Sequence, residues 1–368
     1  MKPHFLPCII LTITMSLLLC NCSEDRIRGN LFLIKEFPHT INLKGSSITE
    51  VSDDFYPLQL GIKDSILIFC DWENSPHFHL YKIPEFEFIA SFGKRGRGPS
   101  ELIDPVFWGQ TGNSESNKIW IYQLNARILS LLDIDKTINA SELITLREVI
   151  LPYEILDAVN IIAAADDVYI GTGVDVAGDF FIYNALTGEF KWKEFYMDYD
   201  KKFSEELIKN QGLLHEYKRG IIKIKPDNSR FVKAYIYAPV IDIFNIEGSL
   251  DFTIMLKDYK TPSLSGEMFD MSTMVYYENV FLSNDYIYAL SRNCNFEEYS
   301  MNECNNAEIH VYNWKGEPVC NYRLNEGIAP IAPFVVDEKN KKIYTVNPKS
   351  DEDFFSLFDL DNTVLFKQ

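Results

Sequence analysis

Two stretches of the chain decide the fold class: IFNIEGSL at residues 243–250 and VYNWKGEP at residues 311–318. In each, two apolar or aromatic residues end a β-rich segment. An asparagine, with a glycine three positions later, then supplies the positive backbone angles of a tight turn. A second β-rich segment follows, such as SLDFTIML at residues 249–256. Each stretch therefore predicts a β-hairpin.

The same pattern occurs in four other places along the 368-residue chain. These copies are LYKIPEFEF from Leu80, LLDIDKTI from Leu131, IYNALTGEF from Ile182 and LFDLDNTV from Leu357. The central residues of the six copies, spaced by 51, 51, 61, 68 and 46 residues, are Tyr81, Leu132, Tyr183, Phe244, Tyr312 and Phe358. A period of this length with strand-forming contents indicates an array of similar structural units.

Another β-rich segment precedes most copies, and these segments abound in Ile, Val, Tyr and Trp, as strands do. They are DSILIF, NKIWIY, DVYIG, NDYIYAL and KKIYTV. Each unit thus contains about three or four antiparallel strands. Six such units predict an all-β fold, a six-bladed β-propeller of antiparallel sheets, because radial repetition leaves only short, protected sheet edges. A pair of β-sandwiches is the alternative, but it does not predict six copies at this period.

Two insertions lengthen the repeat. Residues 200–220 show a rough helical period and predict a short helical or loop insertion between the third and fourth units. The run NCNFEEYSMNECNNA from Asn293 extends the fifth hairpin by about ten residues, a length typical of functional or clamped loops. Cys294 and Cys304 bracket this run, and the apolar N-terminal segment predicts an exported chain, so we predict a disulfide between them.

Two further cysteines, Cys70 and Cys320, lie in predicted strands of different units. We predict that they are buried free thiols. A bond between them across the ring stays open as the alternative.

Residues 1–21 are predicted to be a signal peptide, with Lys2 as the positive region and Phe5–Leu19 as the apolar run. The run ends in LLLCNCSED, which resembles a bacterial lipobox, so Cys22 is the predicted lipidated residue and Cys20 the second choice. An ordinary secreted protein that is cut nearby is the alternative. If Cys22 is lipidated, residues 22–40 are the lipid anchor with a tether or first strand, and residues 41–368 are the propeller with the insertion near 200–220.

The segment SFGKRGRGPSEL, residues 91–102, adds a family resemblance. With the lipoprotein signal and the sixfold repeat, it resembles the TolB-like six-bladed propeller lipoproteins of the Bacteroidetes, in which a G-x-G-P-x-E phrase commonly follows the first blade. Gly96, Gly98, Pro99 and Glu101 match that phrase. The acidic residues 24–25 after Cys22 resemble the tag of surface-exposed lipoproteins, which implies an outer-membrane location. The resemblance implies a fold more firmly than a function and brings no catalytic residues with it.

The same segment is tested as a phosphate loop, and it fails. A phosphate loop requires Ser or Thr after the Gly-Lys pair, whereas Arg95 follows Lys94. Pro99 also removes a backbone donor where the loop should present one. We therefore predict a tight inter-blade crossing in which Glu101 pairs with a nearby cation. A basic, ligand-facing loop of Lys94, Arg95 and Arg97 is the alternative.

Candidate chemistry elsewhere is sparse. The net charge of -18 argues against general nucleic-acid binding. His77 and His79 have a metal-ligand spacing on a strand, but no further ligand is evident nearby, so we expect them to be solvated. No nucleophile elbow and no complete calcium loop occur. The sequence therefore predicts no catalytic residue, no metal and no cofactor.

Two classes of function remain. The first is a lipid-anchored cell-envelope protein that binds a protein or glycan through a propeller face or the central channel, without catalysis. The second is a propeller enzyme, a glycan or peptide lyase or hydrolase, with its active site at the channel mouth. The first is favoured because no catalytic constellation is visible, and the basic loop is its first candidate contact for an acidic partner or glycan. Fold alone does not decide between them.

Overall fold

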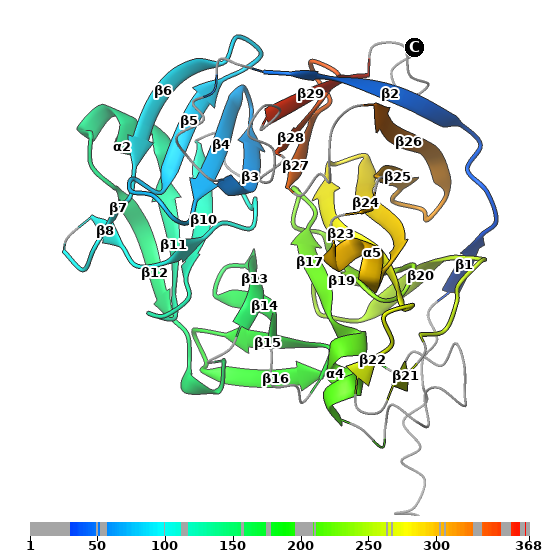
Figure 1. The fold of residues 1–368 in the computed structure, drawn as a ribbon. Coiled ribbons are helices and arrows are strands. Elements are labelled where there is room, and N and C mark those ends of the chain that lie inside the picture. Colours follow the sequence, from blue (N-terminus) through cyan, green and yellow to red (C-terminus); the bar gives the residue numbers. More distant parts are fainter. Residues whose placement is uncertain are drawn as a thin grey trace, which may run out of the picture.

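The computed structural model arranges the chain as a ring of β-sheets around a central axis (Figure 1). The described residues are 30–48, 51, 57–98, 100–111, 117–155, 158–173, 178–195, 209, 211–262, 264–265, 268–301, 303–304, 307–326, 333–346, 355–360 and 365. The predicted signal peptide, Cys22, Pro99 and most of residues 200–210 lie outside them. Among the described residues, no helix is long and apolar enough to cross a bilayer.

The ring has six blades, which confirms the predicted six-bladed propeller. Blades 1 to 3 run, from inner to outer strand, as β3 (Pro57–Lys63), β4 (Ile66–Asp71), β5 (Phe78–Lys82), β6 (Glu87–Phe92); β9 (Pro105–Val106), β10 (Lys118–Gln123), β11 (Ile128–Asp133), β12 (Thr145–Ile150); and β13 (Ala158–Ala165), β14 (Val168–Gly173), β15 (Phe180–Asn184), β16 (Glu189–Lys193). Blades 4 to 6 run as β17 (Gly220–Ile224), β18 (Arg230–Tyr235), β19 (Val240–Asn245), β20 (Leu250–Leu256); β23 (Met274–Leu282), β24 (Tyr286–Asn295), β25 (Glu308–Asn313), β26 (Pro318–Glu326); and β27 (Phe334–Asp337), β28 (Lys342–Val346), β29 (Phe355–Asp359).

In blades 1, 3, 4 and 5 the repeated motif forms the turn between the third and fourth strands, whereas in blade 6 the motif ends β29 and the fourth strand is β2 (Thr40–Ser47). In blade 4 the Asn245 carbonyl accepts from Gly248 N, and the Asn245 side-chain oxygen accepts from Ser249 N at 2.9 Å. Blade 5 repeats this arrangement with Asn313 and Gly316. Both glycines have positive φ, 78° and 83°, which an L-residue adopts only with strain. The turn chemistry expected from the sequence is therefore the chemistry that the structure uses.

Blade 2 departs from this pattern. Instead of a tight turn, the helix α2 (Ile134–Ala140) follows β11, so the expectation of a short hairpin is wrong at this copy. Asp133 is the N-cap, and its carboxylate accepts from Lys136 N at 3.0 Å. The Asp at the turn position of the motif thus begins a helix here, because an N-cap and an Asx turn use the same side-chain acceptor.

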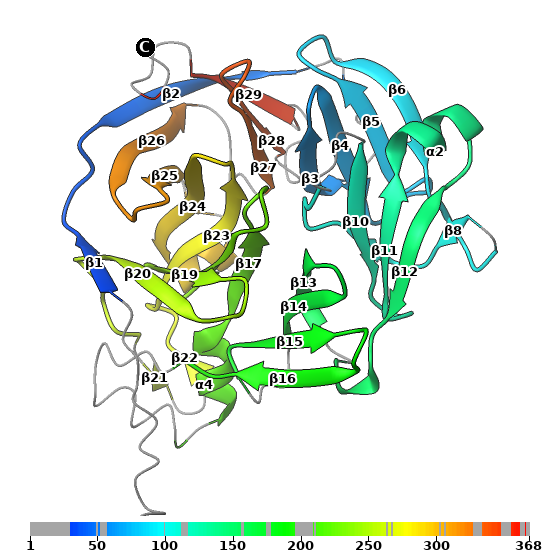
Figure 2. The same cartoon turned by 180° about the vertical axis from the view of Figure 1, so that it is seen from behind.

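The N-terminal part of the chain closes the ring from outside. Strand β1 (Asn30–Ile34) adds to blade 4, parallel to β20. Strand β2 (Thr40–Ser47) pairs first in parallel with β26 of blade 5 and then antiparallel with β29 of blade 6. Figures 1 and 2 show β2 passing across the outer edges of these two blades. One strand therefore joins the last two blades into an eight-stranded sheet.

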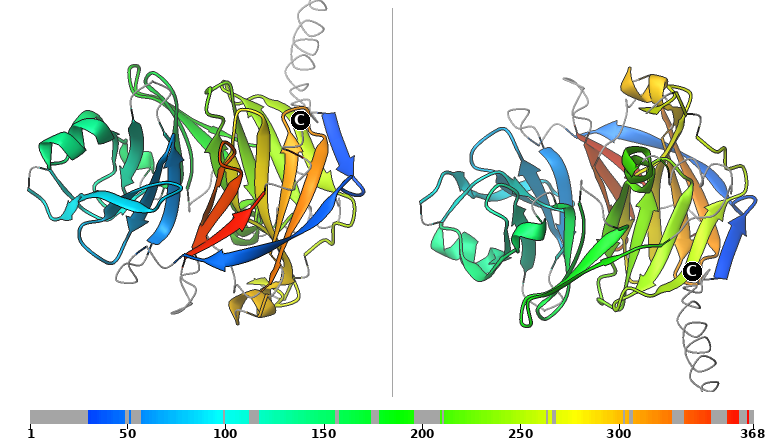
Figure 3. Two further views of the ribbon diagram at one scale, coloured as in Figure 1. Left: turned by 90° about the horizontal axis from the view of Figure 1, so that it is seen from above. Right: turned by 90° about the horizontal axis from the view of Figure 1, so that it is seen from below.

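The antiparallel order sends the connections alternately to the two ends of the ring. The turns between first and second and between third and fourth strands share one end, which we call the turn face. The remaining connections share the other end, the loop face, which carries the helices α4 (Gln211–Lys218) and α5 (Phe296–Ser300) and the short pairs β7 (Lys94–Arg95) with β8 (Glu101–Leu102) and β21 (Leu264–Ser265) with β22 (Met268–Phe269). Edge-on views place α2 and α5 on opposite faces (Figure 3).

The hydrophobic core lies between neighbouring blades. One buried cluster joins Leu80 of blade 1 to Ile121 of blade 2, and others join the remaining neighbours in the same way. The central residues of all six motif copies are buried in such clusters. Cys70 and Cys320 are also buried and are free thiols, as predicted. The insertion predicted near residues 200–220 includes α4, which packs over blade 4.

Candidate functional site

The inner strands of the six blades enclose a central channel with a cavity of about 280 Å³. Its walls include the aromatic side chains of Phe107, Trp108, Phe281 and Phe334. Its polar lining residues are Gln59, Gln110, Thr111, Asn160, Lys223, Asn228, Glu278 and Asn279. Concave sites with mostly apolar walls and a few placed polar groups are the usual form of small-molecule sites.

Lys223 reaches across the channel from β17. Its ammonium donates to the Trp108 carbonyl, which belongs to blade 2, so the side chain bridges blade 4 and blade 2 past the inner strand of blade 3. Gly109, next to Trp108, has a positive φ of 77°, and an added Cβ would lie 3.2 Å from the Leu60 carbonyl oxygen, so the backbone there favours glycine. Burial lowers the pKa of the Lys223 ammonium to about 8.

The side chains of two glutamines in the channel wall form hydrogen bonds with the backbone. Gln110 donates to the Ala163 carbonyl at 2.7 Å and accepts from Ala163 N at 2.8 Å. Gln59 accepts from Phe107 N. Asn160 differs, because its side-chain oxygen is buried and has no hydrogen-bond partner among the described residues. The channel thus contains one amide oxygen that a bound molecule or water can satisfy.

Glu278 is the acid that lines the cavity. It occupies the irregular step between Tyr277 and Asn279 where the β23–β24 register shifts, and such bulges re-aim a side chain. Its carboxylate pairs with Arg292 and accepts from the Tyr299 hydroxyl at 3.1 Å. Burial, with the neighbouring Glu278 charge, raises the pKa of Tyr299 to about 12. The acid is therefore held by two donors.

Tyr299 comes from the lengthened fifth hairpin. In this hairpin Cys294 and Cys304 are joined by a disulfide with Cα atoms 5.9 Å apart, and α5 lies between them. Asn295 caps α5 in a capping box with Glu298. Closing a loop of this size contributes about 2 to 3 kcal/mol in the chain-entropy model. The clamp therefore holds Tyr299 at the loop-face side of the channel.

The basic loop has a different environment on the loop face. Arg95 donates from its guanidinium to the Trp72 carbonyl and from its backbone to Ser75 Oγ at 2.9 Å. Its role in the loop is therefore structural. Lys94 and Arg97 are exposed, and neither has an ion-pair partner in the described part of the chain. The Trp72 residue, whose carbonyl accepts from Arg95 in this loop, is 40% exposed.

The family phrase is explained by one carboxylate. Glu101 accepts from Gly98 N at 2.7 Å and so ties the loop to itself. A Cβ added at Gly96 would clash with the Glu101 carboxylate in its present position, so a side chain there would displace this carboxylate from Gly98 N. The predicted inter-blade crossing is present, but the partner of Glu101 in the structure is backbone N–H, where we expected a cation. Pro99, which belongs to the phrase, lies outside the described residues.

The histidine pair is not solvated in the way that the sequence indicated. His77 is fully buried, and its Nδ1 lies 2.8 Å from the Asp71 carbonyl oxygen. Nδ1 of His79 lies 2.9 Å from Ser91 Oγ. Burial lowers the pKa of both rings. No group of three or more possible metal ligands gathers among the described residues.

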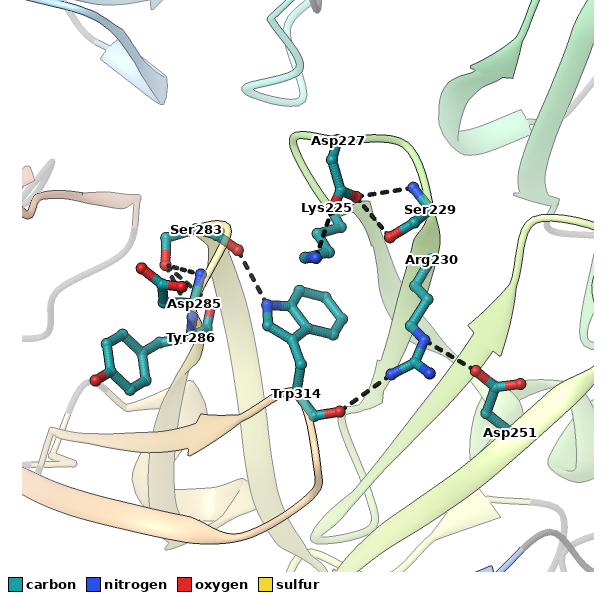
Figure 4. Close-up of polar contacts among 9 residues, drawn as sticks. All are labelled: Lys225, Asp227, Ser229, Arg230, Asp251, Ser283, Asp285, Tyr286 and Trp314. Atoms are coloured by element: carbon teal, nitrogen blue, oxygen red, sulfur yellow. Dashed lines mark hydrogen bonds and ion pairs between the residues drawn. The ribbon is translucent and has the colours of Figure 1, made fainter.

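A further polar cluster lies on the turn face between blades 4 and 5 (Figure 4). Trp314 donates from its indole to the Ser283 carbonyl at 3.1 Å, and its own carbonyl accepts from Arg230 at 3.1 Å. The Lys225 ammonium lies 5.2 Å from the centre of the Trp314 ring, and Arg230 pairs with Asp251 at 3.0 Å. These groups pair with one another across two blades, so the cluster stabilises the ring rather than offering an open site.

The sequence missed the channel residues. Lys223, Asn160 and Glu278 lie in three different blades, and the stretches around them carry no motif. The only local signal was the length of the fifth hairpin, which leads to Tyr299 but not to its partner. In such a repeat, the residues that line a channel should be looked for on the first strand of each unit, because that strand is the inner one.

Comparison with known proteins agrees with this architecture. A family model described as a TolB-like 6-blade propeller matches residues 36–339. A crystal structure of a DUF4221 family member from Bacteroides vulgatus is similar with a TM-score of 0.53 and 12% identity, covering 89% of this chain and 97% of that one. A Bacteroides fragilis protein, assumed to be exported, has a TM-score of 0.51 and 12% identity, with 87% and 98% covered. No curated protein matches the chain.

Proposed function

Because this chain belongs to the TolB-like six-blade propeller family, we propose that it is a lipid-anchored cell-envelope protein that binds a partner through its loop face and catalyses no reaction. The observation that carries this proposal is the loop on the loop face that presents the exposed cations Lys94 and Arg97, which have no ion-pair partner among the described residues. Arg95 of the same loop contacts the exposed Trp72. Loops on a rigid scaffold are where recognition residues are usually found. The partner that fits two free cations on an otherwise acidic protein carries negative charge.

A second aromatic and cation pair supports the loop face over the other end of the ring. Tyr153 is 72% exposed, and the Arg127 guanidinium lies 4.6 Å from the centre of its ring. Ile150, Met271 and Met301 are also exposed on this face. Trp, Tyr, Met and Arg are enriched at protein interfaces. This breadth favours an acidic protein segment as the partner over a short glycan.

The channel does not favour the enzymatic alternative. Glycoside hydrolysis usually requires a pair of carboxylates around an open position. Glu278 is the only carboxylate among the described residues that line the cavity, and Arg292 and Tyr299 already hold it. The binding function therefore accounts better for this arrangement.

The anchor is part of the proposal. Residues 23–29 separate Cys22 from β1, and a fully extended segment of seven residues spans at most about 25 Å. A lipid on Cys22 would keep the ring close to the bilayer and raise its effective concentration for membrane-bound partners.

We expect a fatty-acid probe to label the parent protein in cells and not the Cys22→Ala variant. Cys20→Ala is the matched control and should be labelled as the parent is. Equal labelling of the Cys22→Ala variant and the parent would reassign the anchor or remove it.

The loop-face proposal predicts salt-sensitive binding of a fluorescent oligoglutamate peptide to the purified protein. Replacing both Lys94 and Arg97 by Ser should weaken this binding roughly two- to thirtyfold, because each exposed ion pair contributes about 0.2 to 1 kcal/mol. The matched control replaces Lys315 and Lys339, which are exposed on the turn face, by Ser. Equal losses in both double variants would show a general charge effect and contradict the site. Tighter binding of polygalacturonate than of the peptide would identify a glycan partner instead.

A further inference from the structure

Three lysines lie within or beside blade 4, and they differ in their partners: Lys218 and Lys233 are buried, and Lys223 is half-buried. Lys218 and Lys233 share the carboxylate of Asp179, at 3.1 and 3.3 Å. Lys223 faces the channel instead, and its partner among the described residues is the neutral carbonyl of Trp108. The two buried ammonium groups are therefore neutralised by a carboxylate, and the half-buried one at the channel has no carboxylate partner among the described residues.

An ammonium without a counter-charge in a confined site is costly, since buried charges are normally paired. The carboxylate of Glu278 lines the same cavity, but it is bonded to Arg292 and Tyr299. The lowered pKa of Lys223, about 8, is the direction expected for such a group. The cavity consequently favours an anion that can reach Lys223.

Asn160 gives the cavity a second requirement. Its residue is 4% exposed, and its side-chain oxygen has no partner in the described structure. It lies on β13, the inner strand adjacent to β17, which carries Lys223. An acceptor of this kind is satisfied by a hydroxyl or an amide N–H. The two side chains together are therefore complementary to a molecule with an anionic group and a hydrogen-bond donor.

The size of the cavity limits that molecule. A volume of about 280 Å³ equals about nine water molecules of the liquid. It is near the lower end of small-molecule pockets, and four aromatic side chains provide apolar walls. We propose that the channel binds a small hydroxylated carboxylate, with Lys223 holding the carboxylate and Asn160 accepting from a hydroxyl. This site lies inside the ring and is independent of the loop-face contact.

The test compares three probes by titration calorimetry on the purified protein: galacturonate, galactose, which lacks the carboxylate, and acetate, which lacks the hydroxyls. We expect galacturonate to bind more tightly than either of the others. Lys223→Met should lose about tenfold or more, as expected for a hydrogen bond to a charged group. Lys225→Met is the matched control, because Lys225 lies two residues further along the chain and pairs with Asp227 outside the cavity lining. Asn160→Ala should weaken galacturonate and leave acetate unchanged.

Thermal melting distinguishes a loss of binding from a loss of folding in the variants. Removing an unpaired charge should leave the ligand-free Lys223→Met variant at least as stable as the parent, while galacturonate should raise the Tm of the parent alone. Equal binding by the Lys223→Met variant, or no preference for galacturonate over acetate, would overturn the proposal. The Lys94→Ser/Arg97→Ser variant should bind galacturonate as the parent does, so a failure of the loop-face proposal can be distinguished from a failure of the channel proposal.

Affinity should also depend on pH. The titratable groups of the described cavity lining are Lys223 and Glu278, and the ligand carboxylate is ionised above about pH 5. Binding requires the Lys223 ammonium, so affinity should be constant from about pH 6 to 7. It should fall about tenfold per pH unit once the pH exceeds the pKa of about 8 in the empty protein. An affinity unchanged between pH 7 and 9.5 would contradict the role of Lys223.

Discussion

Asp179→Ala is expected to lower the free energy of unfolding by about 3 to 5 kcal/mol, the cost of removing one partner from a buried charge pair. The Asp179 side chain is completely buried and lies 3.3 Å from Lys233 Nζ and 3.1 Å from Lys218 Nζ. It also accepts from Phe195 N at 2.6 Å. The substitution leaves two ammonium groups without their shared counter-charge between blades 3 and 4, and urea unfolding measures the loss.

Two other variants separate charge from shape. Asp179→Asn keeps an oxygen for Phe195 N but removes the charge, so most of the loss should remain. Asp227→Ala breaks a partly exposed turn-face pair with Lys225, whose side chains are 44% and 15% exposed, and should cost about 1 kcal/mol. If Asp179→Ala costs no more than Asp227→Ala, the cluster does not hold the two blades together.

Leu43→Ala is expected to destabilise the protein by about 2 to 5 kcal/mol, the range for truncating a buried leucine. Leu43 lies on β2 at the point where this strand passes from blade 5 to blade 6. It shares one buried cluster with Leu324 of blade 5 and Phe358 of blade 6. A cavity there weakens the seam that closes the ring, and both urea unfolding and the rate of proteolysis should report it.

Leu31→Ala is the matched control for this variant. Leu31 lies on the other N-terminal strand, β1, which also pairs in parallel with the outer strand of a blade, but its side chain is 52% exposed. Its truncation should change stability by less than about 0.5 kcal/mol. Equal effects of the two substitutions would mean that β2 adds little to ring closure.

Some residues of the candidate site could be predicted from the nearby sequence, and others could not. The phrase around Gly96, Gly98 and Glu101 was readable as a loop, because its contacts are within six residues. The exposed cations of that loop were also named from the sequence. Lys223 and Asn160 were not, since a lysine in a strand and an asparagine in a strand show nothing of the channel until the inner strands are set side by side.

The number of units and the chemistry of the Asn–Gly turns were predictable from the sequence. Asn245 and Gly248 contact neighbours within four residues, so the nearby sequence is enough to predict their turn. The Asp133 cap is also a local contact, but it begins a helix rather than a turn. Only the tertiary structure decided that β2 closes the ring and that Lys223 faces a cavity while Lys233 meets Asp179. These contacts join residues tens to hundreds of positions apart, and the packing of whole blades selects them, because no local pattern specifies the partner of a strand edge or of a buried charge.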